Sequence, residues 1–176
     1  MLFANSSLDQ SSQELDDRKR ELLDLITEVL RRQPYLRYFQ GYHDICQVFL
    51  LVLGKDCTPA ISRLSILRIR DYMLPSLAPA LAQLRLLPSI LNKVDPDLCA
   101  HLSQTQPFFA LAATLTLYAH DIQEYGDIAR LFDILIAREA VFSVYLFVQV
   151  GSLWIPALKF CLHYLVDYLT EKEGAI

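Results

Sequence analysis

Apolar residues recur at helical spacing along most of this sequence, in segments that stop at a proline or a glycine. In the clearest segment, residues 11–33, Leu22, Ile26 and Val29 fall on one stripe while charged residues fill the other faces. We find no polar and apolar alternation between hairpin turns and no fixed repeat period, so neither a sheet fold nor a helical solenoid is expected. The pattern predicts an all-α chain that folds as an irregular orthogonal helical bundle.

Proline and glycine set the predicted helix boundaries. Pro34 cannot continue the first helix, so residues 33–41 are predicted to form a loop. A nearly all-apolar segment then runs from Tyr42 to Leu53, and Gly54 is a natural stop for this buried helix. Further helices are predicted over residues 60–71, 76–94, 97–104, 107–120 and 127–137.

One stretch, from Ala140 to Leu158, contains no charged residue and is long enough to reach the threshold for a membrane span. Polar residues, a glycine and a proline interrupt it, and a chain with 53% hydrophobic residues needs a central buried helix. We therefore predict a core helix over residues 140–150. Residues 151–170 fit either a second core helix or a membrane-associated hairpin, so membrane association through residues 140–170 stays open.

Length and composition limit the class of protein. A chain of 176 residues is long enough for one domain with a hydrophobic core, so residues 1–176 are interpreted as a single domain. The formal net charge of −4 leaves no basic excess to neutralise phosphates, and no nucleic-acid partner is expected. The cysteines lack paired spacing and the histidines lie far apart, so no metal site is predicted. The first residues carry no secretory signal, which favours a cytoplasmic location.

The segment from Tyr38 to Asp44, Tyr-Phe-Gln-Gly-Tyr-His-Asp, places aromatic, carboxamide and glycine residues just before the predicted buried helix. Loops held by rigid elements often carry function. The Gln40 carboxamide can donate and accept, so it can hold a water molecule in line with a phosphoryl group, and Gly41 permits a close approach. The residue types alone also fit a structural loop, with Tyr38 and Tyr42 as half-buried anchors and Gln40 solvated.

This segment resembles the Tyr-x-Gln-Gly motif of TBC domains, the all-helical modules that accelerate GTP hydrolysis by Rab GTPases. It is most similar to the subgroup associated with the endoplasmic reticulum and early Golgi. Residues 94–98 and 108–111 are also similar to that subgroup, and residues 130–133, Arg-Leu-Phe-Asp, resemble the family's Arg-x-Trp-Asp segment. The resemblance covers roughly residues 10–150, and residues 151–176 form a divergent apolar C-terminal segment.

The resemblance implies a GTPase activator rather than a hydrolase. Gln40 would be the catalytic residue, a glutamine finger that enters the nucleotide site of the partner and positions the attacking water. The residues implied to shape the loop and contact the Rab GTPase are Tyr38, Gly41, Tyr42 and Asp44. Arg130 and Asp133 are implied to be structural, tying two helices together. The chain would need no cofactor of its own, because the partner supplies GTP and Mg²⁺.

The family's arginine finger lies in an Ile-x-x-Asp-x-x-Arg segment that precedes the helix equivalent to residues 11–33. We expect this segment to be lacking, with the domain truncated at its N-terminus. Asp17 and Arg20 keep the Asp-x-x-Arg spacing, but Glu14 replaces the isoleucine and both lie inside the predicted helix, so we interpret them as solvated surface charge. Because an arginine finger contributes about 10³ to 10⁵ in rate, we expect weak activation through Gln40.

Two functional hypotheses follow. The first is a Rab-directed TBC domain in vesicle-mediated intracellular protein transport, acting in the cytoplasm or at the cytosolic face of endoplasmic reticulum or Golgi membranes. The second is a catalytically silent helical module that binds a Rab GTPase or serves as a membrane-tethered scaffold. GTP hydrolysis that depends on Gln40 would separate them.

Overall fold

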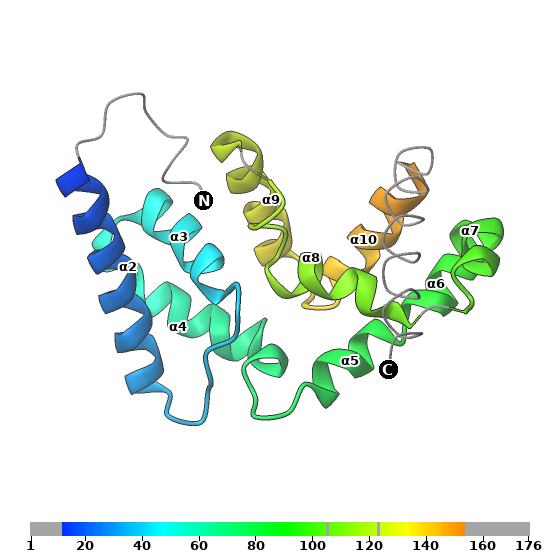
Figure 1. Cartoon of the computed structure of the whole chain (residues 1–176), viewed down its shortest axis with the longest axis horizontal. Coiled ribbons are helices and arrows are strands. Elements are labelled where there is room, and N and C mark those ends of the chain that lie inside the picture. Colours follow the sequence, from blue (N-terminus) through cyan, green and yellow to red (C-terminus); the bar gives the residue numbers. More distant parts are fainter. Residues whose placement is uncertain (1–11, 105, 123, 154–176) are drawn as a thin grey trace, which may run out of the picture.

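The computed structural model describes residues 12–104, 106–122 and 124–153, and every regular element in these ranges is helical (Figure 1). The α-helices are α2 (Ser12–Arg32), α3 (Tyr42–Leu53), α4 (Thr58–Leu67), α5 (Ala78–Leu84), α6 (Leu87–Val94), α7 (Pro96–His101), α8 (Leu111–Leu115), α9 (Tyr125–Ala137) and α10 (Phe142–Leu153). Short 3₁₀ helices are η1 (Lys55–Cys57), η2 (Arg70–Tyr72) and η3 (Pro107–Ala110). The prediction of an all-α bundle is confirmed.

Buried apolar side chains form two clusters at opposite ends of the molecule. The first cluster joins α2, α3, α4 and α9, with Val29, Ile45, Ile61 and Ile128 each fully buried. The second joins α6, α7 and α10. In Figure 1, α8 lies between these two groups of helices. The irregular angles between the helices follow from this division, because each helix turns its apolar stripe toward one of two centres.

The helices at the start of the first cluster match their predicted bounds. Ile26 and Val29 of α2 are buried as predicted, and the loop over residues 33–41 follows that helix. α3 begins and ends at the predicted residues, and Gly54 ends it with a positive φ of 71°. Most of α3 is buried, which explains why its sequence is apolar on all sides.

The helix predicted over residues 60–71 is shorter than expected, since α4 ends at Leu67. The next residue, Arg68, leaves the helix and donates to the backbone oxygens of Ile136, at 2.9 Å, and of Arg138. These carbonyls lie at the C-terminal end of α9, where acceptors have no partner within the helix. A contact with a distant helix therefore decides where α4 stops.

Two further predicted helices are interrupted. The segment over residues 76–94 divides into α5 and α6, because Pro88 lacks an N–H and its ring would clash with the carbonyl of Leu84, where α5 ends. The segment over residues 107–120 contains only η3 and α8, and the chain then takes up left-handed backbone at Leu117 and Tyr118. No glycine marks that turn in the sequence.

The predicted core helix over residues 140–150 is confirmed as α10. Val144 and Val148 are buried in the second cluster, where α10 packs against α6 and α8. Its opposite side is open, with Tyr145 exposed by 46%. Among the helices that the structure describes, none is both long and apolar enough to cross a bilayer. Residues 154–170 of the alternative interpretation lie outside the described residues.

Removing buried volume from α9 tests the first cluster. Ile128→Ala should lower the free energy of unfolding by about 2 to 5 kcal/mol, because Ile128 has no exposed surface and the change leaves a cavity. Ile134→Ala on the same helix is the matched control, since Ile134 is 49% exposed and should change stability by less than about 0.5 kcal/mol. Urea unfolding followed by circular dichroism measures both, and equal losses would contradict this account.

Candidate functional site

Gln40 lies at the corner of a tight turn that enters α3. The backbone N–H of Tyr42 donates to the carbonyl oxygen of Phe39 at 3.1 Å and closes the turn. Gly41 has φ 105° and ψ −11°, which fits the third position of a type II turn. Gln40 is exposed whereas Gly41 is buried. The turn therefore projects the carboxamide away from the body of the domain.

Two separate constraints require glycine at position 41. Its positive φ belongs to a region that residues with a Cβ rarely occupy. A Cβ placed on Gly41 would also lie 2.6 Å from Cγ2 of Thr116, well inside van der Waals contact. The segment after α8 thus packs directly against the backbone of the turn, and the glycine makes that approach possible.

Tyr42 anchors the turn from beneath. Its side chain has no exposed surface, and its hydroxyl lies 2.8 Å from Oγ of Ser65 on α4. Because Ser65 donates its own hydrogen to the carbonyl oxygen of Ile61 at 2.8 Å, Tyr42 is the donor in this pair. Burial raises the pKa of Tyr42 far above its usual value, which keeps that donor proton in place. A side chain so enclosed cannot contact a partner, and its role is to support Gln40.

Tyr38 lies on the outer side of the turn and is 47% exposed. Its hydroxyl is 2.7 Å from Nδ1 of His43, and the two rings are stacked with centroids 6.3 Å apart. Partial burial, followed by the charge of Asp44, raises the pKa of Tyr38, which favours the hydroxyl as donor to the imidazole. Of the predicted contact residues, Tyr38 is the one with a large accessible side chain.

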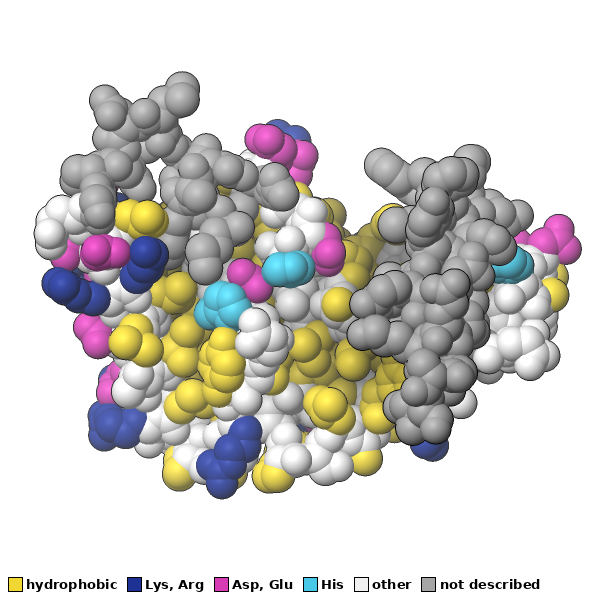
Figure 2. All heavy atoms as spheres, viewed as in Figure 1, with side chains coloured by type: hydrophobic (Ala, Val, Ile, Leu, Met, Phe, Trp, Pro, Cys, Tyr) yellow, Lys and Arg dark blue, Asp and Glu magenta, His cyan; other side chains and the backbone are white. Residues whose placement is uncertain are grey.

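Asp44 is placed behind the turn rather than on its surface. Its side chain is only 9% exposed, and it lies in the first turn of α3, where a negative charge suits the helix dipole. One carboxylate oxygen lies 3.7 Å from Nε2 of His43, and the other lies 3.4 Å from Nδ1 of His120. In Figure 2, histidine and acidic side chains gather near the middle of the face shown, above a stretch of apolar atoms.

The sequence prediction missed both histidines. His43 lies within the quoted motif, and its spacing from Tyr38 could have been noticed. His120 carries no local signal, because it follows α8 and reaches Asp44 only through the tertiary fold. Thr116 was missed for the same reason.

Arg130 and Asp133 do not link two helices in the described part of the chain. Both are exposed on α9, and neither forms a hydrogen bond or an ion pair with another described residue. Asp133 instead lines a mostly apolar pocket of about 190 Å³ between α3 and α9, with Phe132 at its wall. Arg68 forms the connection that was predicted for Arg130, by binding the last carbonyls of α9.

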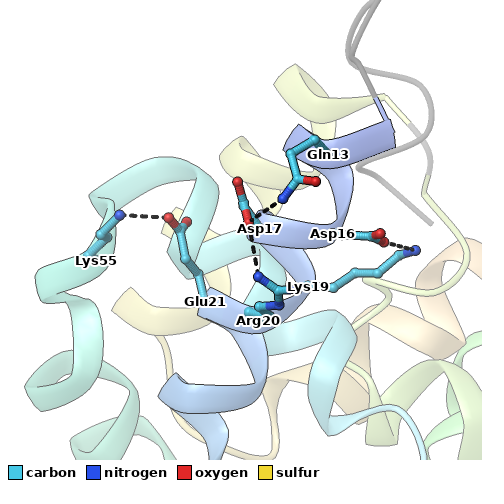
Figure 3. Close-up of polar contacts among 7 residues, drawn as sticks. All are labelled: Gln13, Asp16, Asp17, Lys19, Arg20, Glu21 and Lys55. Carbon is cyan, nitrogen blue, oxygen red and sulfur yellow. Dashed lines mark hydrogen bonds and ion pairs between the residues drawn. The ribbon is translucent and has the colours of Figure 1, made fainter.

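Asp17 and Arg20 are confirmed as surface charge. They pair with each other at 3.4 Å on α2, and Gln13 donates to the same carboxylate (Figure 3). The side chain of Arg20 is 72% exposed. Exposed pairs of this kind contribute about 0 to 1 kcal/mol to stability. Asp17 and Arg20 lie on the solvated face of α2, and Arg20 is not placed as an arginine finger.

Comparison with known proteins identifies relatives of the chain. The family model described as Rab-GTPase-TBC domain matches residues 4–151, which confirms the resemblance inferred from the Gln40 motif. The chain is 36% identical over 135 residues to "GTPase-activating protein gyp10" of Schizosaccharomyces pombe, covering 75% of this chain and 36% of the relative. It is 33% identical over 130 residues to "TBC1 domain family member 20" of Homo sapiens, covering 72% and 32% respectively. The chain spans about a third of the length of these relatives.

Adding a methyl group at Gly41 tests the geometry of the turn. Gly41→Ala should destabilise the domain by at least about 1 to 2 kcal/mol for the left-handed backbone, with a further cost from the contact with Thr116. Gly126→Ala is the matched control, because no atom lies within 4 Å of its added Cβ and it belongs to α9. This control should be neutral or stabilising by up to about 1 kcal/mol.

A double substitution separates the two costs. Thr116→Ser removes the Cγ2 atom and keeps the hydroxyl that donates to the carbonyl oxygen of Ala112 at 3.0 Å. Combined with Gly41→Ala, it should recover the steric part of the loss and leave the backbone part. Urea unfolding of the single and double variants provides the measurement. Full additivity of the two substitutions would show that the turn and the segment after α8 do not touch.

Proposed function

The chain belongs to the Rab-GTPase-TBC domain family, and on this premise we propose that it binds a Rab-family small GTPase and promotes hydrolysis of the GTP bound to that partner. The observation that carries the proposal is the exposed Gln40 at the corner of a turn with a buried, hydrogen-bonded base. The name of one relative, "GTPase-activating protein gyp10", supports the same proposal.

Gln40 would act by positioning the attacking water. A carboxamide offers an oxygen that accepts from the water and an N–H that donates to a phosphoryl oxygen. Phosphoryl transfer depends chiefly on the placement of the nucleophile and on charge stabilisation, so a well-held carboxamide can accelerate it. GTP and Mg²⁺ would come with the partner GTPase, and this chain would contribute no cofactor.

The surface that meets the partner would centre on Gln40 and Tyr38. Tyr38 is accessible beside the turn, and an aromatic side chain with a polar tip is well suited to an interface. Asp44 and Gly41 would contribute indirectly, since both lie behind the exposed residues. We therefore assign the direct contacts with the partner to Gln40 and Tyr38, and not to every residue of the motif.

An arginine finger accounts for about 10³ to 10⁵ of the rate in related phosphoryl transfers. Arg20 does not supply that group, because it pairs with Asp17 on the solvated face of α2. The contribution we assign to the described residues is therefore the glutamine alone, and we expect modest acceleration from it.

We further propose a role in vesicle-mediated transport at the cytosolic face of endoplasmic reticulum or Golgi membranes. The support is the similarity of residues 38–45 to the TBC subgroup associated with those membranes. Localisation of the tagged chain against markers of both compartments would test this, and a uniform cytoplasmic distribution would contradict it.

Replacing Gln40 tests the mechanism. With a panel of GTP-loaded Rab proteins, the chain should raise the rate of phosphate release above the intrinsic rate for at least one member. Gln40→Ala should return the rate to the intrinsic value while leaving the thermal unfolding midpoint unchanged, because Gln40 is exposed and makes no core contact. Gln104→Ala is the matched control, since that glutamine is also exposed in a turn.

Binding measurements distinguish the two hypotheses. A Rab protein that binds the chain in its GTP form, with no acceleration and no sensitivity to Gln40→Ala, would support the catalytically silent module. Absence of binding to every Rab in the panel would overturn the first hypothesis and leave only the membrane-tethered scaffold of the second.

A further inference from the structure

Residues 116–120, which follow α8, pack against the Gln40 turn, and Leu117, Tyr118 and Ala119 among them belong to the first cluster. Thr116 lies against Gly41, and Nδ1 of His120 lies 3.4 Å from Oδ2 of Asp44. Two contacts from one short segment thus reach the backbone of the turn and the carboxylate behind it. Neither contact follows from neighbours in sequence.

This segment is held in a costly backbone conformation. Leu117 has φ 51° and Tyr118 has φ 65°, and neither residue is glycine. Residues in the left-handed region cost about 1 to 3 kcal/mol each and persist only where the surroundings hold them. Here the surroundings do so, since both side chains are buried and the Tyr118 hydroxyl donates to the carbonyl oxygen of Ser143 at 2.7 Å. The segment is therefore a firm support rather than a loose loop.

His120 contributes little to the core, which makes its contact with Asp44 informative. Its side chain is 71% exposed, whereas the side chain of Asp44 is 9% exposed. Asp44 meets His43 on its other oxygen, and His43 in turn meets Tyr38. One hydrogen bond, Tyr38–His43 at 2.7 Å, and two ion-pair contacts of Asp44, at 3.7 Å with His43 and 3.4 Å with His120, therefore lie next to the turn that carries Gln40.

We propose that His120 is a positioning residue for Gln40. Through Asp44 it locks the entrance of α3 against the strained support formed by residues 116–120, and this holds the carboxamide in one direction while the partner binds. It need not touch the nucleotide. The inference rests on the proposed function for its catalytic consequence, because a displacement of about 1 Å in a reacting group can cost about 10²-fold in rate.

The first test measures the backbone mobility of the Gln40 turn and needs no GTPase. Backbone ¹⁵N relaxation of the full chain should give Gly41 an order parameter near the rigid value of about 0.85, and His120→Ala should lower it toward the flexible range below about 0.6. His120→Asn should preserve the rigid value, because its amide N–H₂ can take the place of Nδ1 beside Oδ2 of Asp44 and donate to it. His101→Ala, an exposed histidine at the end of α7, is the matched control and should have no effect.

The second test measures catalysis. His120→Ala should lower the maximal rate of Rab GTP hydrolysis by about tenfold or more, with the half-saturating concentration of the chain and its thermal midpoint nearly unchanged. His120→Asn should restore most of that rate. In the Gln40→Ala background, His120→Ala should have no additional effect, because a residue that acts through Gln40 loses its influence when Gln40 is gone.

The outcomes separate this proposal from the function on which it rests. If the unaltered chain accelerates no Rab protein, the proposed function fails, and the relaxation measurement still decides whether His120 holds the turn. An unchanged order parameter at Gly41 in His120→Ala would overturn the proposal, as would independent, additive losses from His120→Ala and Gln40→Ala.

Discussion

The burial of Tyr42 is the constraint on which the functional loop depends. Its ring is enclosed at the first residue of α3, and its hydroxyl is tied to Ser65 of α4. Burying a side chain of this size contributes about 1.5 to 3 kcal/mol, and its hydrogen bond adds about 1 kcal/mol. With Tyr42 fixed inward and Gly41 turning the chain, the residue before them must face outward. Gln40 is exposed because Gly41 and Tyr42, which follow it, are held inside the domain.

The same turn is also supported by a segment that is distant in the sequence. Thr116 and His120 reach it from the segment after α8, and Tyr118 of that segment binds a backbone oxygen of Ser143 in α10. α10 belongs to the second apolar cluster, so the loop that carries Gln40 is connected to both halves of the domain. The catalytic role proposed for Gln40 would require such support, because small errors in placement reduce the rate steeply.

Some elements were predictable from the sequence because their causes are local. The bounds of α3 and the loop before it follow from a proline, an apolar run and a glycine, and all of these act within a few residues. Two helix ends were predicted wrongly because they depend on residues that are distant in the sequence. α4 ends where Arg68 finds carbonyls of α9, and α8 ends where the chain must turn back beneath Gly41. The break at Pro88 was local and could have been predicted.

The sequence by itself determined the helical class, the family and the identity of Gln40 as the candidate catalytic residue, because periodicity and a short motif are properties of neighbouring residues. Only the tertiary structure decided which motif residues are accessible. Tyr38, Gln40, Tyr42 and Asp44 all carry polar groups, yet packing encloses Tyr42 and Asp44 and leaves Tyr38 and Gln40 accessible. It also brought His120 to Asp44, since a contact between segments far apart in the chain depends on how the helices beside them pack into a common core.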